Sequence, residues 1–261
     1  MSIHRHPVLL WVLALLLAVG FAGLGRWQLG RQVEKRVILD AVAAVLAERR
    51  ASPATVVGDP VRSGSYDWTI LSGHFVQAPA VLLDNQRRGD QVGVRVYRAF
   101  QPAPEATGLR PTALPPMLVE LGWLPLPPDR RMPQVPLPVG GFRLEGLLLP
   151  PPGSGLTLGP PATDAQGHLL VTGLHPQALA APMGLTALAP RVLRPPPEFG
   201  FGADAPAYLR DFDILPNTLP PERHLGYAVQ WFALSATVLI VAVVLTLRRR
   251  ATRGTEPELP A

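Results

Sequence analysis

A histidine, a tyrosine and a tryptophan recur at helical spacing near the C-terminal end of the chain. His224, Tyr227 and Trp231 are three and four residues apart, so a helix turning 100° per residue carries them on nearly one face. They open an uncharged, mostly apolar run from Leu225 to Leu247, which is long enough to span a bilayer. An ionisable side chain at a membrane boundary is costly without a partner, so its default interpretation is functional.

Two interpretations of His224 follow from its chemistry. In the first, the imidazole is an interfacial anchor, and Tyr227 and Trp231 belong to the aromatic belt that marks a membrane surface. In the second, His224 is an axial ligand to haem iron, since neutral imidazole is a standard ligand of that metal. The two aromatic side chains would then flank the macrocycle. Spacing alone leaves both interpretations open.

A second apolar segment lies at the other end of the chain. Residues 8–25 carry no charge and are rich in Leu, Val and Ala, which predicts a transmembrane helix. A signal peptide is the alternative, with Arg5 as its basic region and Ala22-Gly23 as a weak cleavage signal. The helical pattern continues past the apolar run through residues 26–52, which favours the uncleaved helix.

Three residues of this first segment share a face. Gly20, Gly23 and Trp27 recur at offsets of three and four, and small residues let another helix or a flat cofactor approach closely. Room for a macrocycle and simple helix packing explain them equally well. We include Trp27 among the candidate cofactor-binding residues.

Composition excludes several classes of chemistry. The chain has 261 residues and no cysteine, which excludes disulfides, thiolate catalysis, iron–sulfur clusters and covalent c-type haem attachment. The formal net charge is +5, but the long loop between the two apolar segments is nearly neutral. The basic balance therefore comes largely from the tails and does not indicate a nucleic-acid partner.

The distribution of arginine predicts the topology. Residues 248–250 are all Arg and Arg253 follows, which places this end of the second span in the cytoplasm. Two spans return the N-terminus to the same side, so both termini are expected in the cytoplasm of a bacterium and the large loop in the periplasm. The expected location is the inner (plasma) membrane, among its lipids. Four basic residues just outside the first span argue weakly for the reverse orientation: Arg26, Arg31, Lys35 and Arg36.

The sequence pattern of the large loop is typical of a β-rich domain. Short apolar runs alternate with turn residues, and Val92 to Phe100 alternates valine with arginine as a half-buried strand does. Strands in succession predict an antiparallel sheet or a barrel. The expected strands are 66–76, 80–83, 92–100, 117–124, 142–149, 169–174 and 191–193. Asp84-Asn85 predicts a turn and 175–183 a short helix, while proline-rich connectors occupy 125–138, 150–152 and 195–197.

The fold class is therefore a membrane protein in which two transmembrane helices flank a β-rich domain of α+β type. The expected divisions are a cytoplasmic N-terminus (1–7), a first transmembrane helix (8–25), a helical extension (26–52), a periplasmic β-rich domain (53–223), a second transmembrane helix (224–247) and a basic cytoplasmic tail (248–261).

No motif of an enzyme stands out. The sequence has no Gly-x-Ser-x-Gly, no Walker loop and no dinucleotide fingerprint after a strand. Asp211 and Asp213 are either a metal pair or solvated loop carboxylates. An enzyme would need His74 or His168 beside Asp84, within reach of proton transfer. We expect a protein that is not an enzyme.

Several segments resemble one known family. Trp27-Gln28, followed by Arg31 and Lys35, resembles the Leu-Gly-x-Trp-Gln-x-x-Arg-x-x-x-Lys signature of the Surfeit locus family, the Shy-type assembly factors of haem–copper cytochrome oxidase. The closing His224–Phe232 is similar to the family's His-x-x-Tyr-Ala-x-Gln-Trp-Phe. Three further segments fit in order between them: Gly73-His74-Phe75, Leu83–Arg87 with Gly93-Val94-x-Val96, and Leu118–Pro125.

This chain also departs from the family's pattern. Glu120-Leu121 stands where the family has Asn-Arg before Gly-Trp, and Gln86 interrupts the family's Asp-Asn-Arg. Ala189-Pro190-Arg191 is a remnant of its Trp-Pro-Arg segment.

The resemblance implies a membrane-embedded factor that helps to mature the main oxidase subunit. It implies haem a as a transiently held cofactor, with His224 as the ligand of its iron and Tyr227, Trp231 and Trp27 as pocket or packing residues. The implied partners are the main oxidase subunit and the machinery of haem a synthesis. A membrane-anchored periplasmic sensor or ligand-binding module is the alternative, and its mark would be a cytoplasmic signalling domain.

Overall fold

The computed structural model describes residues 7–104, 114–152, 159–202, 205–215 and 218–253. The chain divides into two units. The first, here called the helical hairpin, comprises residues 1–39 and 219–261, and the second, the β domain, comprises Asp40–Thr218. The extreme tails that we expected in the cytoplasm lie outside the described residues, apart from residues 7 and 248–253.

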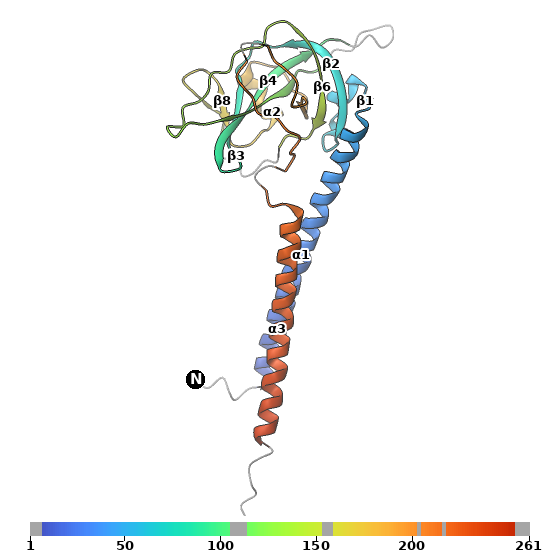
Figure 1. Ribbon diagram of the computed structural model, residues 1–261, viewed down its shortest axis with the longest axis vertical. Helices are drawn as coiled ribbons and strands as arrows, with labels where there is room; N and C mark the ends of the chain where they lie inside the picture. Colours follow the sequence, from blue (N-terminus) through green and yellow to red (C-terminus); the bar gives the residue numbers. More distant parts are fainter. Residues whose placement is uncertain (1–6, 105–113, 153–158, 203–204, 216–217, 254–261) are drawn as a thin grey trace, which may run out of the picture. The chain divides into compact units, whose positions relative to one another are not determined.

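Two long helices make up most of the hairpin. Helix α1 runs from Pro7 to Glu48 and helix α3 from Pro221 to Arg253, and they lie side by side (Figure 1). Both are long and apolar enough to cross a membrane, and only 17% and 6% of their most apolar windows are buried. Their apolar side chains are thus displayed outward, unlike those of a core helix in a globular domain.

The end of α1 belongs to the β domain. Val42 is buried in one of the domain's two cores, and Arg49 ends the helix with a left-handed φ of 44°. The Arg49 amide still donates to the Val45 carbonyl at 2.8 Å, which satisfies one of the last carbonyls of the helix. The helix therefore ends before Ser52-Pro53, because Ser52 is already part of a strand.

The described strands form a nine-stranded mixed sheet in the order β1-β2-β6-β9-β5-β4-β3-β8-β7 (Figure 1). An additional pairing of β2 with β4 closes β2, β6, β9, β5 and β4 into a barrel-like ring. The strands are β1 (Ala51–Ser52), β2 (Asp67–Phe75), β3 (Val81–Arg88), β4 (Gln91–Pro102), β5 (Met117–Pro125), β6 (Gly141–Leu149), β7 (Ala162–Thr163), β8 (Leu169–Val171) and β9 (Val192–Arg194).

Most, but not all, of the pairings are antiparallel. The pairs β1–β2, β3–β8 and β5–β9 are parallel, so the sheet is mixed, and of the two expected forms, an antiparallel sheet or a barrel, the closed ring fits the barrel. The chain makes long crossings before β8 and β9, and such crossings let a strand return in the same direction as its neighbour. The expected short helix is present as α2 (Pro176–Leu179), with Pro176 in its first turn, followed by a 3₁₀ turn at Ala181–Met183.

Alternation along the strands builds one core on each side of the ring. Val94, Val96 and Phe100 of β4 belong to the inner core, whereas Tyr97 and Ala99 belong to the outer one. The outer core also holds side chains from α2 and from the end of α1. A bulge in β5, where Gly122 has a φ of +136°, adjusts the register between β4 and β5.

The predicted turn at Asp84-Asn85 is wrong. Strand β3 continues through both residues, with a register shift between Leu83 and Gln86. Asn85 has a φ of 57°, and its backbone amide donates a hydrogen bond to the Asp84 carboxylate at 2.6 Å. Asn tolerates the left-handed region, so these polar residues form a bulge, and the chain turns at Gly89 instead.

Candidate functional site

The two helices of the hairpin are antiparallel. The indole of Trp11 donates to the Thr246 hydroxyl at 3.0 Å, and the Ser235 hydroxyl donates to the Ala18 carbonyl at 2.8 Å. Low residue numbers of α1 therefore face high residue numbers of α3, as in an antiparallel pair. Continuing this order places the polar residues that follow the apolar run of α1 opposite the first turns of α3.

His224 meets Gln28 at that level. The imidazole Nδ1 lies 2.6 Å from the side-chain oxygen of Gln28, and His224 is only 8% exposed. An amide oxygen can only accept a hydrogen bond, so Nδ1 carries the proton and donates. The other ring nitrogen, Nε2, then keeps its lone pair. Metal-bound histidines show this arrangement, in which a partner fixes the tautomer and ring orientation.

The sequence of α1 explains why Gln28 faces α3. Ala14, Ala18, Phe21, Gly25 and Gln28 recur at helical spacing and form its contact face. Ala14 and Ala18 are buried, and a Cβ added at Gly25 would lie 2.9 Å from the ring of Phe232. These small residues let the helices approach closely. Gln28 continues the same stripe where the apolar run ends.

The predicted aromatic residues do not all gather around the histidine. Trp231 stacks on Phe21 with ring centroids 5.6 Å apart, so it shares the contact face with His224. Tyr227 lies at the margin of that face and is 38% exposed. Trp27 is 57% exposed and lies beside Gly20 and Gly23 on the face of α1 that points away from α3. The structure thus does not bring Trp27 to His224.

Gly20 and Gly23 do not mediate helix packing in the hairpin. An added Cβ at either residue would meet no described atom within 4 Å. The glycine that permits close approach is Gly25, which the sequence pattern did not single out.

The basic residues beyond Gln28 have partners within the hairpin. The Lys35 ammonium is buried and donates to the Leu219 carbonyl, and Arg31 forms an ion pair with Glu34 at 2.6 Å. These two cations are therefore partly committed to local contacts.

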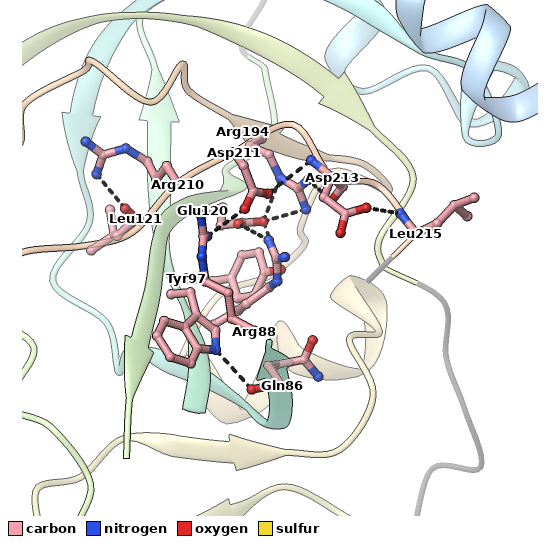
Figure 2. Close-up of polar contacts among 12 residues, drawn as sticks. Gln86, Arg88, Tyr97, Glu120, Leu121, Arg194, Arg210, Asp211, Asp213 and Leu215 are labelled. Atoms are coloured by element: carbon pink, nitrogen blue, oxygen red, sulfur yellow. Dashed lines mark hydrogen bonds and ion pairs between the residues drawn. The ribbon is translucent and has the colours of Figure 1, made fainter. Parts of the chain in front are cut away.

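The β domain buries a different kind of polar cluster around Glu120 (Figure 2). One oxygen of Glu120 accepts from Arg95 at 2.6 Å, and the other accepts from Arg194 at 3.0 Å and from the Tyr97 hydroxyl at 3.2 Å. Burial alone would raise the pKa of Glu120, but Arg194 and Arg95 outweigh it and hold that pKa below the usual range. Burial and the neighbouring carboxylate raise the pKa of Tyr97.

Residues 205–215 lie across this cluster (Figure 2). Leu209 and Trp123 exchange two backbone hydrogen bonds, and the Asp213 carbonyl accepts from Arg194 at 2.7 Å. Asp211 forms an ion pair with Arg88 at 2.6 Å, whereas the Asp213 carboxylate accepts from a backbone amide. Among the described residues no group of three or more His, Asp or Glu side chains could hold a metal ion.

The residues that an enzyme would need are engaged elsewhere. His168 pairs with Asp164 at 2.8 Å, and Asp84 pairs with Arg130 at 2.8 Å. Within the described parts of the chain, no hydrogen bond or ion pair joins Asp84 to His74 or His168.

The glycine–tryptophan motifs of the β domain are explained by packing. A Cβ at Gly93 would lie 2.4 Å from the indole of Trp123 and 2.2 Å from the Leu124 carbonyl. The Trp123 indole in turn donates to the Gln86 carbonyl at 3.0 Å. These residues fix the pairing of β4 with β5.

Sequence reasoning missed Gln28 as the partner of His224. The sequence did contain a signal for it. Gln28 is an amide just after the first apolar run, and His224 lies just before the second, so an antiparallel pair of helices would bring the two together. The model of the SURF1 family matches residues 15–236. A search of curated proteins gave no match.

Proposed function

The chain belongs to the SURF1 family, and from this membership we propose that it assists the assembly of a haem–copper cytochrome oxidase by holding haem a near His224. The family consists of oxidase assembly factors and is not a family of enzymes. The proposal that haem a is held near His224 rests on the hydrogen bond from His224 to Gln28.

The residues of the hairpin fit a haem ligand. Since Gln28 holds the proton on Nδ1, Nε2 of His224 is the nitrogen with a free lone pair, which is what a haem iron requires of an imidazole. The bound group would supply an iron that accepts this nitrogen. Trp231, fixed by stacking on Phe21, would present an apolar wall, and Tyr227 would line the margin. Trp27, on the opposite face of α1, would contact lipid or a partner.

The same proposal assigns a location. The hairpin spans the bacterial inner membrane with both termini in the cytoplasm, and the β domain lies in the periplasm. The arginines at 248–250 support this orientation through the positive-inside rule. His224 and Gln28 then lie at the periplasmic boundary of the membrane. There the factor would meet the main oxidase subunit and the machinery that makes haem a.

Complementation of a deletion strain tests the function. Oxidase content is measured from the haem a band of membranes that carry the wild-type chain, His224→Ala or Ser235→Ala. Ser235→Ala is the matched control, because it removes one bond between the helices and leaves His224 untouched. We expect the wild type and Ser235→Ala to restore the band and His224→Ala to restore much less. A deletion strain with a normal band would overturn the assignment to oxidase assembly.

A further inference from the structure

A polar hollow of about 420 Å³ opens on the β domain. Its walls come from the link between β2 and β3, from β4, from the proline-rich connector after β5, and from the turn before β8. Its volume lies in the range of small-molecule sites. The residues that matter to its chemistry are Gln77, Arg98, Gln134, Gln166 and His168.

Arg98 is the unusual member of this group. It is only 8% exposed, and its two terminal nitrogens donate to the carbonyls of Ala78 and Val135, which both line the hollow. Its Nε is buried and has no partner among the described residues. Each terminal nitrogen keeps a second N–H, because a guanidinium has five donors.

Each of the other strongly buried arginines described in the domain has a carboxylate partner. Arg95 and Arg194 share Glu120, and Arg191 pairs with Asp67 at 2.6 Å. Arg98 forms no ion pair with any described residue. Consistent with this, burial lowers the pKa of Arg98, with only the Tyr208 phenol acting in the opposite direction. A buried cation without a counter-charge is costly.

His168 stands preorganised at the same hollow. Its Nδ1 contacts the Asp164 carboxylate at 2.8 Å, and that carboxylate also accepts from the backbone amides of His168 and Gln166. The ring is thereby fixed and its Nε2 is left for another contact. Asp164 itself does not line the hollow, and no lining residue is acidic.

We propose that this hollow binds a carboxylate, which supplies the counter-charge that Arg98 lacks. The two remaining N–H groups on the terminal nitrogens match the two oxygens of a carboxylate, and bidentate pairs of this kind are strong. A single guanidinium balances one negative charge and would leave a phosphate dianion undercompensated. The rim glutamines would orient the rest of the ligand. The carboxylate comes either from a small metabolite or from an acidic side chain of a peptide.

Calorimetric titration of the full-length protein in detergent tests the site. The probes are butyrate, its amide as an uncharged control, a short blocked peptide with one glutamate, and inorganic phosphate. We expect heat from butyrate or from the peptide and none from the amide. Binding of butyrate identifies a free metabolite as the source, and binding of the peptide alone identifies a protein segment. Binding of neither carboxylate, or equal binding of phosphate, would overturn the proposal.

Three variants tie the binding to this hollow. Arg98→Met should weaken carboxylate binding at least about tenfold, because a hydrogen bond to a charged group is lost. Gln166→Glu changes an exposed side chain at the rim, so the protein folds normally and binding falls by repulsion. Arg130→Met removes an exposed arginine outside the hollow and should leave binding unchanged. Wild-type affinity in both Arg98→Met and Gln166→Glu would contradict the site.

Discussion

The β domain and the helical hairpin bury polar side chains in opposite ways. In the domain, Glu120 is surrounded by two arginines and a tyrosine, and both of its oxygens are occupied. In the hairpin, His224 is held by one neutral amide, and Nε2 keeps its lone pair. A saturated cluster rigidifies its surroundings and binds nothing further, whereas a half-satisfied imidazole retains the capacity to bind a ligand.

The comparison separates scaffold from site. The closed ring of strands, the Glu120 cluster and the Trp123 motif hold the β domain together. The hairpin contributes His224, the side chain with spare bonding capacity. Among the strongly buried arginines that the structure describes in the domain, Arg98 is the exception, since no carboxylate pairs with it.

Removing the centre of the saturated cluster should have the largest effect. Glu120→Ala leaves Arg95 and Arg194 buried without a counter-charge, so we expect a loss of about 3–5 kcal/mol in the free energy of unfolding. Denaturant unfolding of the full-length protein, followed by the circular dichroism of the strands, measures it. Glu145→Ala, an exposed glutamate on β6, is the matched control. A loss no larger than that of the control would mean that the cluster is not saturated as described.

A close approach within the scaffold gives the next largest effect. Gly93→Ala places a methyl group against the Trp123 ring and the Leu124 carbonyl, and such overpacking costs about 1–3 kcal/mol. Gly64→Ala is the control, because a Cβ there meets nothing within 4 Å. The same unfolding assay compares the two variants, and equal stabilities would show that β4 and β5 can move apart freely.

In the hairpin, Gln28→Leu should loosen the histidine without removing it. Loss of a hydrogen-bond partner behind a metal-bound imidazole lowers affinity about 10- to 100-fold, so haem retention should fall, but less than in His224→Ala. Absorbance of haem per purified protein measures it. Gln28→Glu keeps an acceptor for Nδ1 and serves as the control. If Gln28→Leu retained as much haem as the wild type, the Gln28 amide would not contribute to haem binding.

Acid should weaken a second polar cluster of the domain, in which Asp67 pairs with Arg62 and Arg191. Burial tends to raise the pKa of Asp67, but hydrogen bonds from Arg62 and Arg191 hold it below its usual value. Such a carboxylate stabilises the fold above its unfolded pKa of about 3.9, and the contribution disappears as pH falls through the folded pKa. Arg62→Met should therefore be less stable than the wild type near neutral pH and equally stable in strong acid.

The expected difference for Arg62→Met is small. Because the Arg62 side chain is 42% exposed, solvent screens the pair and the loss should stay below about 1 kcal/mol. Denaturant midpoints at neutral and acidic pH reveal it, with Arg131→Met, which removes an exposed pair with Asp129, as the control. A difference that persists in acid would show that Arg62 acts through packing and not through the charge of Asp67.

Much of the fold was predictable because it depends on local pattern. Apolar runs long enough to span a bilayer identified both long helices, and alternation identified β4. The direction of β8 and β9 was not predictable, since it depends on the path of long connectors. The prediction of a turn at Asp84-Asn85 was wrong because the same residue types form both turns and bulges.

The candidate site was predictable only in part. The spacing of His224 and Trp231 placed both on one helical face, and the structure confirms that they share it. Trp27 could not be assigned, because a helix sequence alone does not say which face meets its neighbour. The sequence pattern of β4 does not distinguish Arg95 from Arg98. In the structure their side chains lie in different places, with Arg95 at Glu120 and Arg98 at the hollow.

The reduced-minus-oxidised spectrum of the purified protein tests the central claim most directly. The wild type, His224→Ala and Ser235→Ala are prepared in mild detergent from cells that make haem a. The account predicts a haem signal in the wild type and in Ser235→Ala that is lost in His224→Ala. The same haem content in His224→Ala as in the wild type would contradict the assignment of His224 as the ligand.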